Sequence, residues 1–241
     1  FLIEGVTSSD NIIAIFSISF LLASSITQAQ TLDIEISNLT HGMFFTPLLV
    51  SSHGESMHLF ESGEIASDEL KILAEGGDTT SLGVATTALG AINLENPAAG
   101  LLAPSATVEI TDFDTMSNDR LSIAAMLLPT NDGFVGLDSW DIPDTAGTYT
   151  IYLNAYDAGS EANDELVVDG SGAVGILGIP ANPGANGGAS GTGVTTTESN
   201  EMIHIHRGNV GDTNDAGGVS DVDSRIHRWL NPVAKVVVTV K

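Results

Sequence analysis

Apolar and polar residues alternate with a period of two along much of this chain, and this feature constrains its fold most. Near the start, Leu32, Ile34 and Ile36 alternate with polar residues. A period of two places every second side chain on the same face of a β-strand. Further extended runs occur at 43–51, 57–60, 107–111, 121–128, 134–137, 148–155, 202–206 and 233–240. Many short strands separated by turn signals predict an all-β protein, and we expect an antiparallel β-sandwich.

One segment, residues 66–75, has the pattern of a helix. Leu70 and Leu73 share a helical face, acidic residues suit the first turn, and Gly76-Gly77 ends the pattern. The following stretch, 82–106, is rich in Ala, Gly and Thr, and we expect a long irregular connection with one short strand. The predicted sandwich therefore contains one short helix.

Glycine-rich loops are expected in the second half of the chain. Residues 169–193 contain nine glycines and two prolines. Such a segment lacks the side chains to build a core, so we expect a mobile surface loop. The sequence has no internal repeat and no sign of a second domain, and we expect residues 30–241 to form one domain.

The first 29 residues have the features of a secretory signal peptide. Residues 12–23 form a largely apolar run without charge, and Thr27-Gln28-Ala29 carries small residues at the −3 and −1 positions of a cleavage site. The run is too short to span a membrane. We therefore expect cleavage after Ala29, an extracellular or periplasmic location, and no membrane span in the mature chain. A buried N-terminal helix is the alternative.

The charge of the chain restricts its partners. It has 31 Asp and Glu against 7 Lys and Arg, a formal net charge of −24. Such a chain repels nucleic acid and anionic lipid, and it favours hard cations. Because it has no cysteine, the fold must depend on its apolar core, with or without a metal.

Several short motifs occur in a characteristic order. They are Ser37-Asn38-Leu39-Thr40, Phe45-Thr46-Pro47-Leu48, Leu73-Ala74-Glu75-Gly76-Gly77-Asp78, Pro129-Thr130-Asn131-Asp132-Gly133-Phe134-Val135-Gly136-Leu137-Asp138, Tyr156-Asp157-Ala158-Gly159-Ser160-Glu161 and Pro232-Val233-Ala234-Lys235-Val236. Together they resemble the spondin N-terminal domain family over most of the chain. The resemblance implies a β-sandwich similar to the C2 domain, with calcium held in loops at one end, in an extracellular matrix or adhesion protein. The chain departs from animal members by having no cysteine, so it resembles a stand-alone microbial form, and integrin partners are not implied.

Four acidic residues form the first candidate metal site: Asp132, Asp138, Asp157 and Glu161. Each lies in or beside a turn at the end of a predicted strand. Calcium takes six to eight oxygen ligands in flexible geometry, which carboxylates on several loops can supply. The alternative is that these acids only cap local turns. A second acidic cluster, formed by Asp112, Asp114, Asn118 and Asp119, is more typical of turn chemistry than of a metal site.

Met202, His204 and His206 form an alternative metal site. The period of a strand places all three on one face, and thioether and imidazole ligands together suit copper. A polar strand face with hydrogen-bonded histidines is the simpler interpretation. Residues that could add ligands to a copper site are His41, Met43, His53, Met57 and His58.

The sequence carries no recognised catalytic motif. It lacks cysteine, a Gly-x-Ser-x-Gly motif and a phosphate-binding loop with its lysine. A carboxylate pair for glycoside cleavage stays open, because the fold sets its geometry. We therefore predict a secreted, non-enzymatic, calcium-binding adhesion or matrix module with an extracellular protein or glycan as partner. A secreted or periplasmic copper-binding protein is the alternative, and a hydrolase with an unrecognised site is a third possibility.

Overall fold

The structure is a computed structural model that describes residues 29–173, 175–184 and 187–241, so the predicted signal peptide lies outside the described residues except for Ala29. The helices are α1 (Asp68–Gly76) and α2 (Thr80–Ala88). The strands are β1 (Thr31–Asn38), β2 (Phe44–Phe45), β3 (Leu49–His53), β4 (Ile92–Glu95), β5 (Thr107–Asp114), β6 (Arg120–Leu128), β7 (Gly133–Asp141), β8 (Gly147–Asp157), β9 (His204–Ile205) and β10 (Ala234–Val240). Neither helix among these residues has the length and apolar character needed to cross a membrane.

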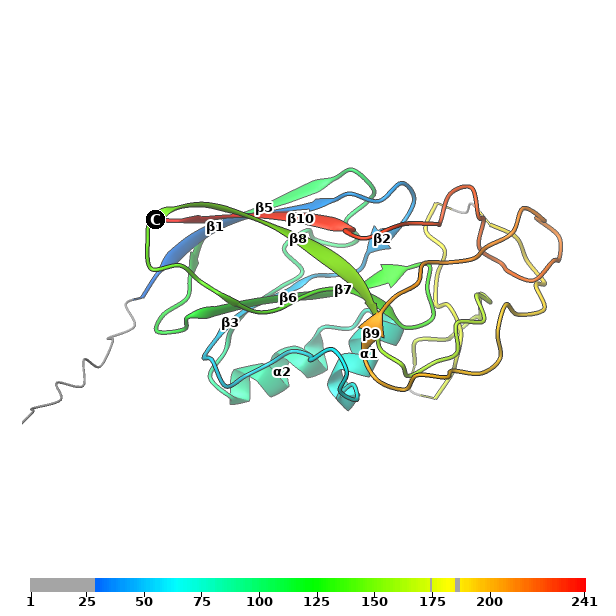
Figure 1. Cartoon of the computed structure of the whole chain (residues 1–241), viewed down its shortest axis with the longest axis horizontal. Coiled ribbons are helices and arrows are strands. Elements are labelled where there is room, and N and C mark those ends of the chain that lie inside the picture. Colours follow the sequence, from blue (N-terminus) through cyan, green and yellow to red (C-terminus); the bar gives the residue numbers. More distant parts are fainter. Residues whose placement is uncertain (1–28, 174, 185–186) are drawn as a thin grey trace, which may run out of the picture.

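The strands form one antiparallel sheet that curls into a half-barrel (Figure 1). Its order is β4-β3-β6-β7-β8-β10-β1-β5, while β2 pairs with β6 and β9 pairs with β8. β8 takes part in both layers and so connects them, because residues 147–153 pair with β10 and residues 154–157 pair with β7. This arrangement confirms the predicted all-β class and the antiparallel pairing. The layers are joined through β8 into a continuous ladder.

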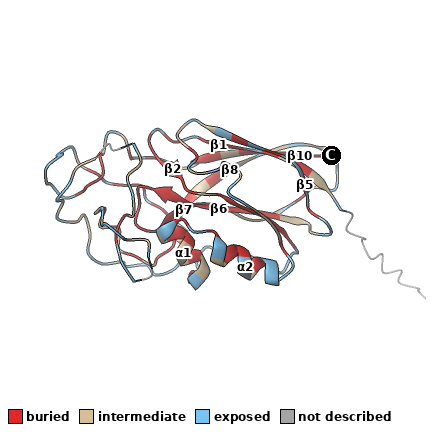
Figure 2. Cartoon of the chain, turned by 180° about the vertical axis from the view of Figure 1, so that it is seen from behind, coloured by how far each residue is buried: buried red, intermediate tan, exposed pale blue. Residues whose placement is uncertain are grey.

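The main core lies between the two layers of the curled sheet (Figure 2). Leu32, Ile34 and Ile36 of β1 are fully buried, as their alternation predicts. β10 is almost continuous valine, yet only every second residue is buried, so Val236 and Val238 face the core. Burying a side chain of this size stabilises the fold by about 1.5–3 kcal/mol.

A second core lies between β6, β7 and the helices, which cover the outer face of the lower layer. Leu70 and Leu73 of α1 are fully buried there beside Phe134. The Ser67 side chain accepts a hydrogen bond from the Leu70 backbone N–H, and Gly77 ends α1 in the left-handed conformation with φ 73°. The predicted helix is thus confirmed, with both of its caps.

The prediction of a single helix is wrong, because α2 occupies part of the expected irregular connection. Its sequence contains three Thr, a Val and a Gly, which have low helical propensity. Contacts with β4 hold it in place. Asn93 donates hydrogen bonds to the Gly83 carbonyl and the Thr86 hydroxyl, and a Cβ at Gly83 would lie 2.6 Å from Glu95 Oε1. Tertiary contacts therefore stabilise a helix that its local sequence does not predict.

The long loops gather at one end of the molecule, and we call residues 158–203 and 206–233 the loop cap (Figure 1). Contrary to the expectation of a loop without a core, Ile179 is fully buried. Buried carboxylates organise the cap by accepting backbone N–H groups. Glu165 accepts hydrogen bonds from the N–H groups of Val210 and Gly211, and Asp221 accepts one from Val167. These bonds replace the ladders of regular secondary structure.

Candidate functional site

Three of the predicted acidic ligands lie together where the sheet meets the loop cap. Asp132 immediately precedes β7, and Asp157 ends β8. Since Gly133 pairs with Asp157, the ladder itself brings these two acids side by side. Glu161 follows the tight bend at Gly159, and all three side chains are buried. We call Asp132, Asp157 and Glu161 the carboxylate cluster.

The Asp132 carboxylate holds the loop that follows β8. Its Oδ2 accepts hydrogen bonds from Ser160 N at 2.8 Å, Ser160 Oγ at 3.2 Å and Glu161 N at 3.0 Å. Its Oδ1 is equally buried but has no hydrogen-bond partner among the described residues. A buried acceptor without a partner is uncommon and costly, which makes this atom a candidate ligand.

The other two acids are fixed by polar neighbours. Asp157 Oδ2 accepts a hydrogen bond of 2.7 Å from Asn163 Nδ2, and Glu161 Oε2 accepts one of 2.8 Å from Gly178 N. Glu161 Oε1, like Asp132 Oδ1, is buried without a partner in the described part of the chain. The cluster therefore has two unpaired oxygens, Asp132 Oδ1 and Glu161 Oε1.

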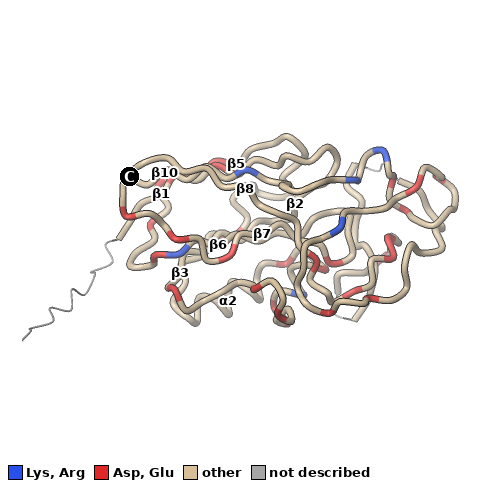
Figure 3. Tube along the Cα trace, in the orientation of Figure 1, with Lys and Arg blue, Asp and Glu red and all other residues tan. Residues whose placement is uncertain are grey.

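Burial and mutual repulsion govern the electrostatics of the cluster. Burial raises the pKa of Asp132 to about 8, with further increases from the charges of Asp157 and Glu161. Burial also raises the pKa of Glu161 to about 7. Acidic residues gather around the cluster and along the loop cap (Figure 3), and no Lys or Arg in the described ranges forms an ion pair with these three acids. The site disfavours its own negative charge and suits a cation.

Two histidines lie near Asp157, and they differ in which ring nitrogen carries the proton. His204 Nδ1 lies 2.8 Å from the Met202 carbonyl, so it donates, and a neutral ring has its lone pair on Nε2, 3.7 Å from Asp157 Oδ2. His206 Nδ1 accepts the Gly208 N–H at 3.0 Å, so Nε2 carries the proton, 4.0 Å from Asp157 Oδ2. Burial lowers the pKa of His206 to about 4, which keeps its ring neutral at pH 7.

Of the predicted copper set, His204 and His206 both approach Asp157 Oδ2. The strand expected at 202–206 is reduced to β9, which covers only His204 and Ile205. Met202 is 48 % exposed, whereas His206 is buried and its ring is tilted by 48° against that of Trp229, with ring centroids 4.9 Å apart.

Asp138 has a different environment from the cluster. Its Oδ1 accepts hydrogen bonds from Leu59 N at 2.7 Å and Phe60 N at 3.3 Å, and its Oδ2 lies 2.6 Å from His58 Nδ1. The hydrogen bond to Asp138 raises the pKa of His58. Asp138 lies five residues along β7 from Gly133, a distance of roughly 16 Å in a strand. It anchors segment 57–60, which was expected to form a strand and does not.

The second acidic cluster makes ordinary turn and surface contacts. Asp114 Oδ1 accepts the Met116 N–H, Asn118 donates to the Ser52 carbonyl, and Asp112 pairs with Lys241 at 2.7 Å. Asp119 lies 3.3 Å from Arg120. These contacts support turn chemistry.

Sequence reasoning missed the residues that surround the acids. Asn131 donates to Glu161, Asn163 donates to Asp157, and His204 faces Asp157 across the β8–β9 pair. Asn131 adjoins Asp132 and could have been included, but nothing in the sequence links His204 to Asp157. Within residues 29–173, 175–184 and 187–241, no group of three or more His, Asp or Glu side chains is arranged to hold a metal ion.

Comparison with known proteins places this geometry in a family. A model described as Spondin_N, the spondin N-terminal domain, matches residues 37–165, more than half of the 241-residue chain. The match contains Asp132, Asp138, Asp157 and Glu161. No curated protein matches the chain significantly. The family is one of extracellular-type modules and is not a known enzyme family. The chain belongs to the spondin N-terminal domain family.

Proposed function

We propose that the protein is a secreted, calcium-binding recognition module of the adhesion or matrix type, without enzymatic activity. The observation that carries this proposal is the carboxylate cluster. Asp132 Oδ1 and Glu161 Oε1 are buried without hydrogen-bond partners, and no Lys or Arg of the described residues forms an ion pair with the cluster. A cation would favour the ionised carboxylates, which burial and mutual repulsion otherwise disfavour.

Calcium fits the chemistry of the cluster best. Asp132, Asp157 and Glu161 offer only carboxylate oxygens, which are hard ligands. Calcium accepts mono- or bidentate carboxylates in flexible geometry and takes remaining ligands from water, whereas magnesium requires near-ideal octahedral geometry. The three acids are not arranged as a ready-made metal site in the described residues, so they would hold the ion by drawing together, and its charge would stiffen the bend between Asp157 and Glu161.

The histidines favour calcium over copper. The single lone pair of neutral His206 accepts the Gly208 N–H, so His206 has none left for a metal. Met202 is half exposed and lies outside β9, whereas His206 is buried. Only His204 retains a free imidazole lone pair beside Asp157, and one imidazole among carboxylates is a poor site for Cu(I).

We also infer that the curled sheet works like a C2-type sandwich, with its ligand-binding loops at the end where β7 begins and β8 ends. Family membership and the position of the cluster support this view. Calcium would fix the loop after β8, and an extracellular protein or glycan would recognise the fixed surface.

Metal analysis and thermal unfolding test the proposal. Purified protein should contain calcium, and chelated protein should gain thermal stability when calcium is returned, by about 2.7 kcal/mol at a hundredfold excess over Kd. Asp157→Asn should weaken the response. The control, Asp144→Asn, makes the same charge change at an exposed turn and should leave the response intact.

If neither calcium nor chelator changes the melting temperature of protein shown to be metal-free, the acids of the cluster act only as turn residues. Copper that is retained on purification and lost in His204→Ala would support the alternative instead.

A further inference from the structure

A cavity of 390 Å³ opens where β7 and β8 part. The β7–β8 ladder ends at the Gly136–Asn154 pair, and beyond it the two strands belong to different layers of the curled sheet. Segment 58–62 forms the third wall. The volume lies within the range of small-molecule sites, about 300–1,000 Å³.

The walls of the cavity are held in place without a ligand. Asp138 fixes segment 58–60 to β7 through the hydrogen bonds described above. Phe60 packs across the bare backbone of Gly136, where a Cβ would lie 2.6 Å from its ring. Its centroid is also 5.0 Å from that of Phe134 and 4.9 Å from that of Tyr156. Such a site loses little freedom on binding.

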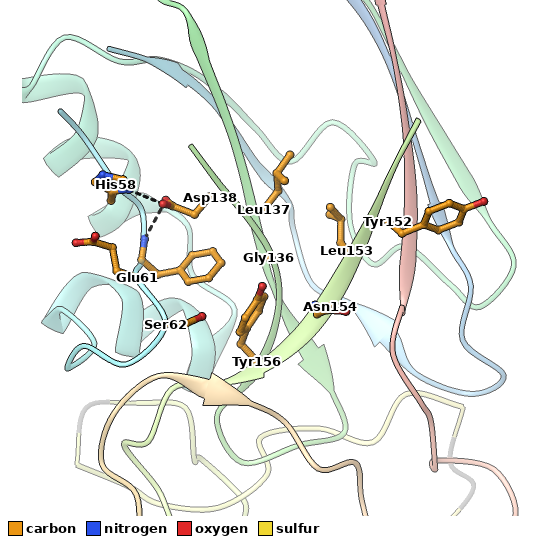
Figure 4. A pocket seen from close by; sticks show the side chains of 11 residues that line it. His58, Glu61, Ser62, Gly136, Leu137, Asp138, Tyr152, Leu153, Asn154 and Tyr156 are labelled. Atoms are coloured by element: carbon orange, nitrogen blue, oxygen red, sulfur yellow. Dashed lines mark hydrogen bonds and ion pairs between the residues drawn. The ribbon is translucent and has the colours of Figure 1, made fainter. Parts of the chain in front are cut away.

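Several polar groups of the cavity have no partner of their own. The side chains of Glu61, Ser62 and Asn154 and the Tyr156 hydroxyl make no hydrogen bond within the described residues. In Figure 4, Ser62 and Tyr156 approach from opposite walls, with Asn154 beside Tyr156. The set contains hydroxyls that donate and accept, an amide that does both, and a carboxylate that accepts.

The charge of the lining excludes anionic ligands. No Lys or Arg lines the cavity, and its one possible cation, His58, is held by Asp138. Glu61 adds a negative charge, and the whole chain carries −24. A phosphate, carboxylate or sulfated ligand would be repelled.

Two other ligand classes fit less well. A peptide strand needs a regular edge, but β7 is bulged where it leaves β8, with Ser139 at φ 51°. An organic ammonium group needs an aromatic cage, but Phe60 is only 6 % exposed and Tyr152 points away from the cavity (Figure 4). Tyr156 is left as a single, partly exposed ring, and Phe134 stacks on it with ring centroids 5.6 Å apart.

We propose that this cavity binds a neutral hexopyranose. One face of such a sugar is lined by C–H groups and can lie on the Tyr156 ring, while its hydroxyls both donate and accept. Asn154, Ser62 and Glu61 would bind those hydroxyls. This site is independent of the carboxylate cluster, because successive residues of a strand point to opposite faces and Tyr156 therefore faces away from Asp157.

The test titrates the full chain with the methyl glycosides of glucose, galactose, mannose and N-acetylglucosamine, using saturation-transfer NMR and calorimetry. At least one should bind saturably. Asn154→Ala and Ser62→Ala should each weaken binding about tenfold, a loss of about 1.4 kcal/mol. Ser62 lies on an exposed loop, so that variant leaves the sheet untouched. Thr150→Ala, exposed on β8 outside the cavity, should bind as the wild type does.

Absence of saturable binding to all four glycosides would overturn the proposal, as would binding that Asn154→Ala and Ser62→Ala leave unchanged. The affinity should also survive chelator and Asp157→Asn. If removing calcium abolished sugar binding, the sugar would bind at the carboxylate cluster, and this result would contradict a separate site. Calcium binding without sugar binding would leave the proposed function standing and remove only this inference.

Discussion

Asp132 carries three hydrogen bonds on one carboxylate oxygen and none on the other. This asymmetry combines two roles in one side chain. Oδ2 shapes the loop after β8, while Oδ1 remains available to a cation. The sequence placed Asp132 correctly in a turn beside a buried strand, but only the structure separates its two oxygens.

The raised pKa of Asp132 predicts that stability depends on pH in calcium-free protein. Its pKa rises from an ordinary 3.8 to about 8, so the folded state retains a proton that the unfolded state loses. The stabilisation that this retained proton gives the folded state is complete below pH 4 and is lost as pH rises through 8. Denaturant unfolding should therefore give a lower free energy of unfolding at pH 9 than at pH 6.

Asp132→Asn is the matched control for this effect. Asparagine can still accept the hydrogen bonds from Ser160 and Glu161 but does not titrate. The free energy of unfolding of the variant should change less between pH 6 and pH 9 than that of the wild type. At pH 9 the variant should be more stable than wild type by about 1–3 kcal/mol. Equal slopes in the two proteins would contradict the assigned pKa.

Gly136 gives a second prediction at the residue scale. A Cβ at this position would lie 2.6 Å from the Phe60 ring, so Gly136→Ala must displace Phe60 from its packing against Phe134 and Tyr156. Overpacking of this kind costs about 1–3 kcal/mol. Gly54→Ala is the control, because no atom lies within 4 Å of its Cβ position. Chemical denaturation should separate the two variants, and equal stability would contradict the close packing.

At the scale of elements, regular alternation predicted most of the sheet. The strands β1, β8 and β10 lie where their patterns place them, because each has one face toward the core and one toward solvent. α2 could not be predicted in this way, since its stability depends on tertiary contacts with α1 and β4, including the hydrogen bonds from Asn93. Three of the four predicted acids do form the carboxylate cluster, whereas Asp138 does not, and the approach of His204 in β9 and of His206 just after it could not be predicted.

Segment 57–60 shows why a short apolar run can fail to form a strand. Its apolar side chains enter the second core, while Asp138 binds its backbone N–H groups at Leu59 and Phe60. A single carboxylate thus replaces a strand partner. The consequence can be measured at His58, whose pKa is raised by the same carboxylate.

Asp138→Asn should lower the pKa of His58 toward its ordinary range, because the charge that favours the protonated ring is removed. An NMR titration of the histidine ring signals checks this prediction. Asp144→Asn, an exposed turn residue, should leave the His58 titration unchanged. A His58 pKa that is the same in wild type and Asp138→Asn would show that the pair does not form in solution.

At the scale of the whole molecule, the net charge of −24 opposes the compact state. Sodium or potassium chloride should raise the melting temperature of chelated protein by screening this repulsion, since the Debye length falls to about 10 Å at 0.1 M. The two salts should act alike, because screening depends on ionic strength alone.

Calcium should act differently, at concentrations too low to change the ionic strength. A calcium effect that sodium chloride reproduces at equal ionic strength would mean general screening and not a site. Asp157→Asn should weaken the calcium effect while leaving the response to sodium chloride unchanged.

The pairing of β1 with β10 has a consequence for how this domain would be displayed. Leu32 lies opposite Val240, and Val240 lies opposite Gly147 of β8, so both ends of the described fold emerge at one pole. Asp157, at the far end of β8, lies at the other pole with the loop cap (Figure 1). A tether at either end would therefore point the carboxylate cluster outward. A pulling force between the two ends would separate β1 from β10 one residue pair at a time. The domain would therefore resist force best when one end and the opposite pole are pulled apart.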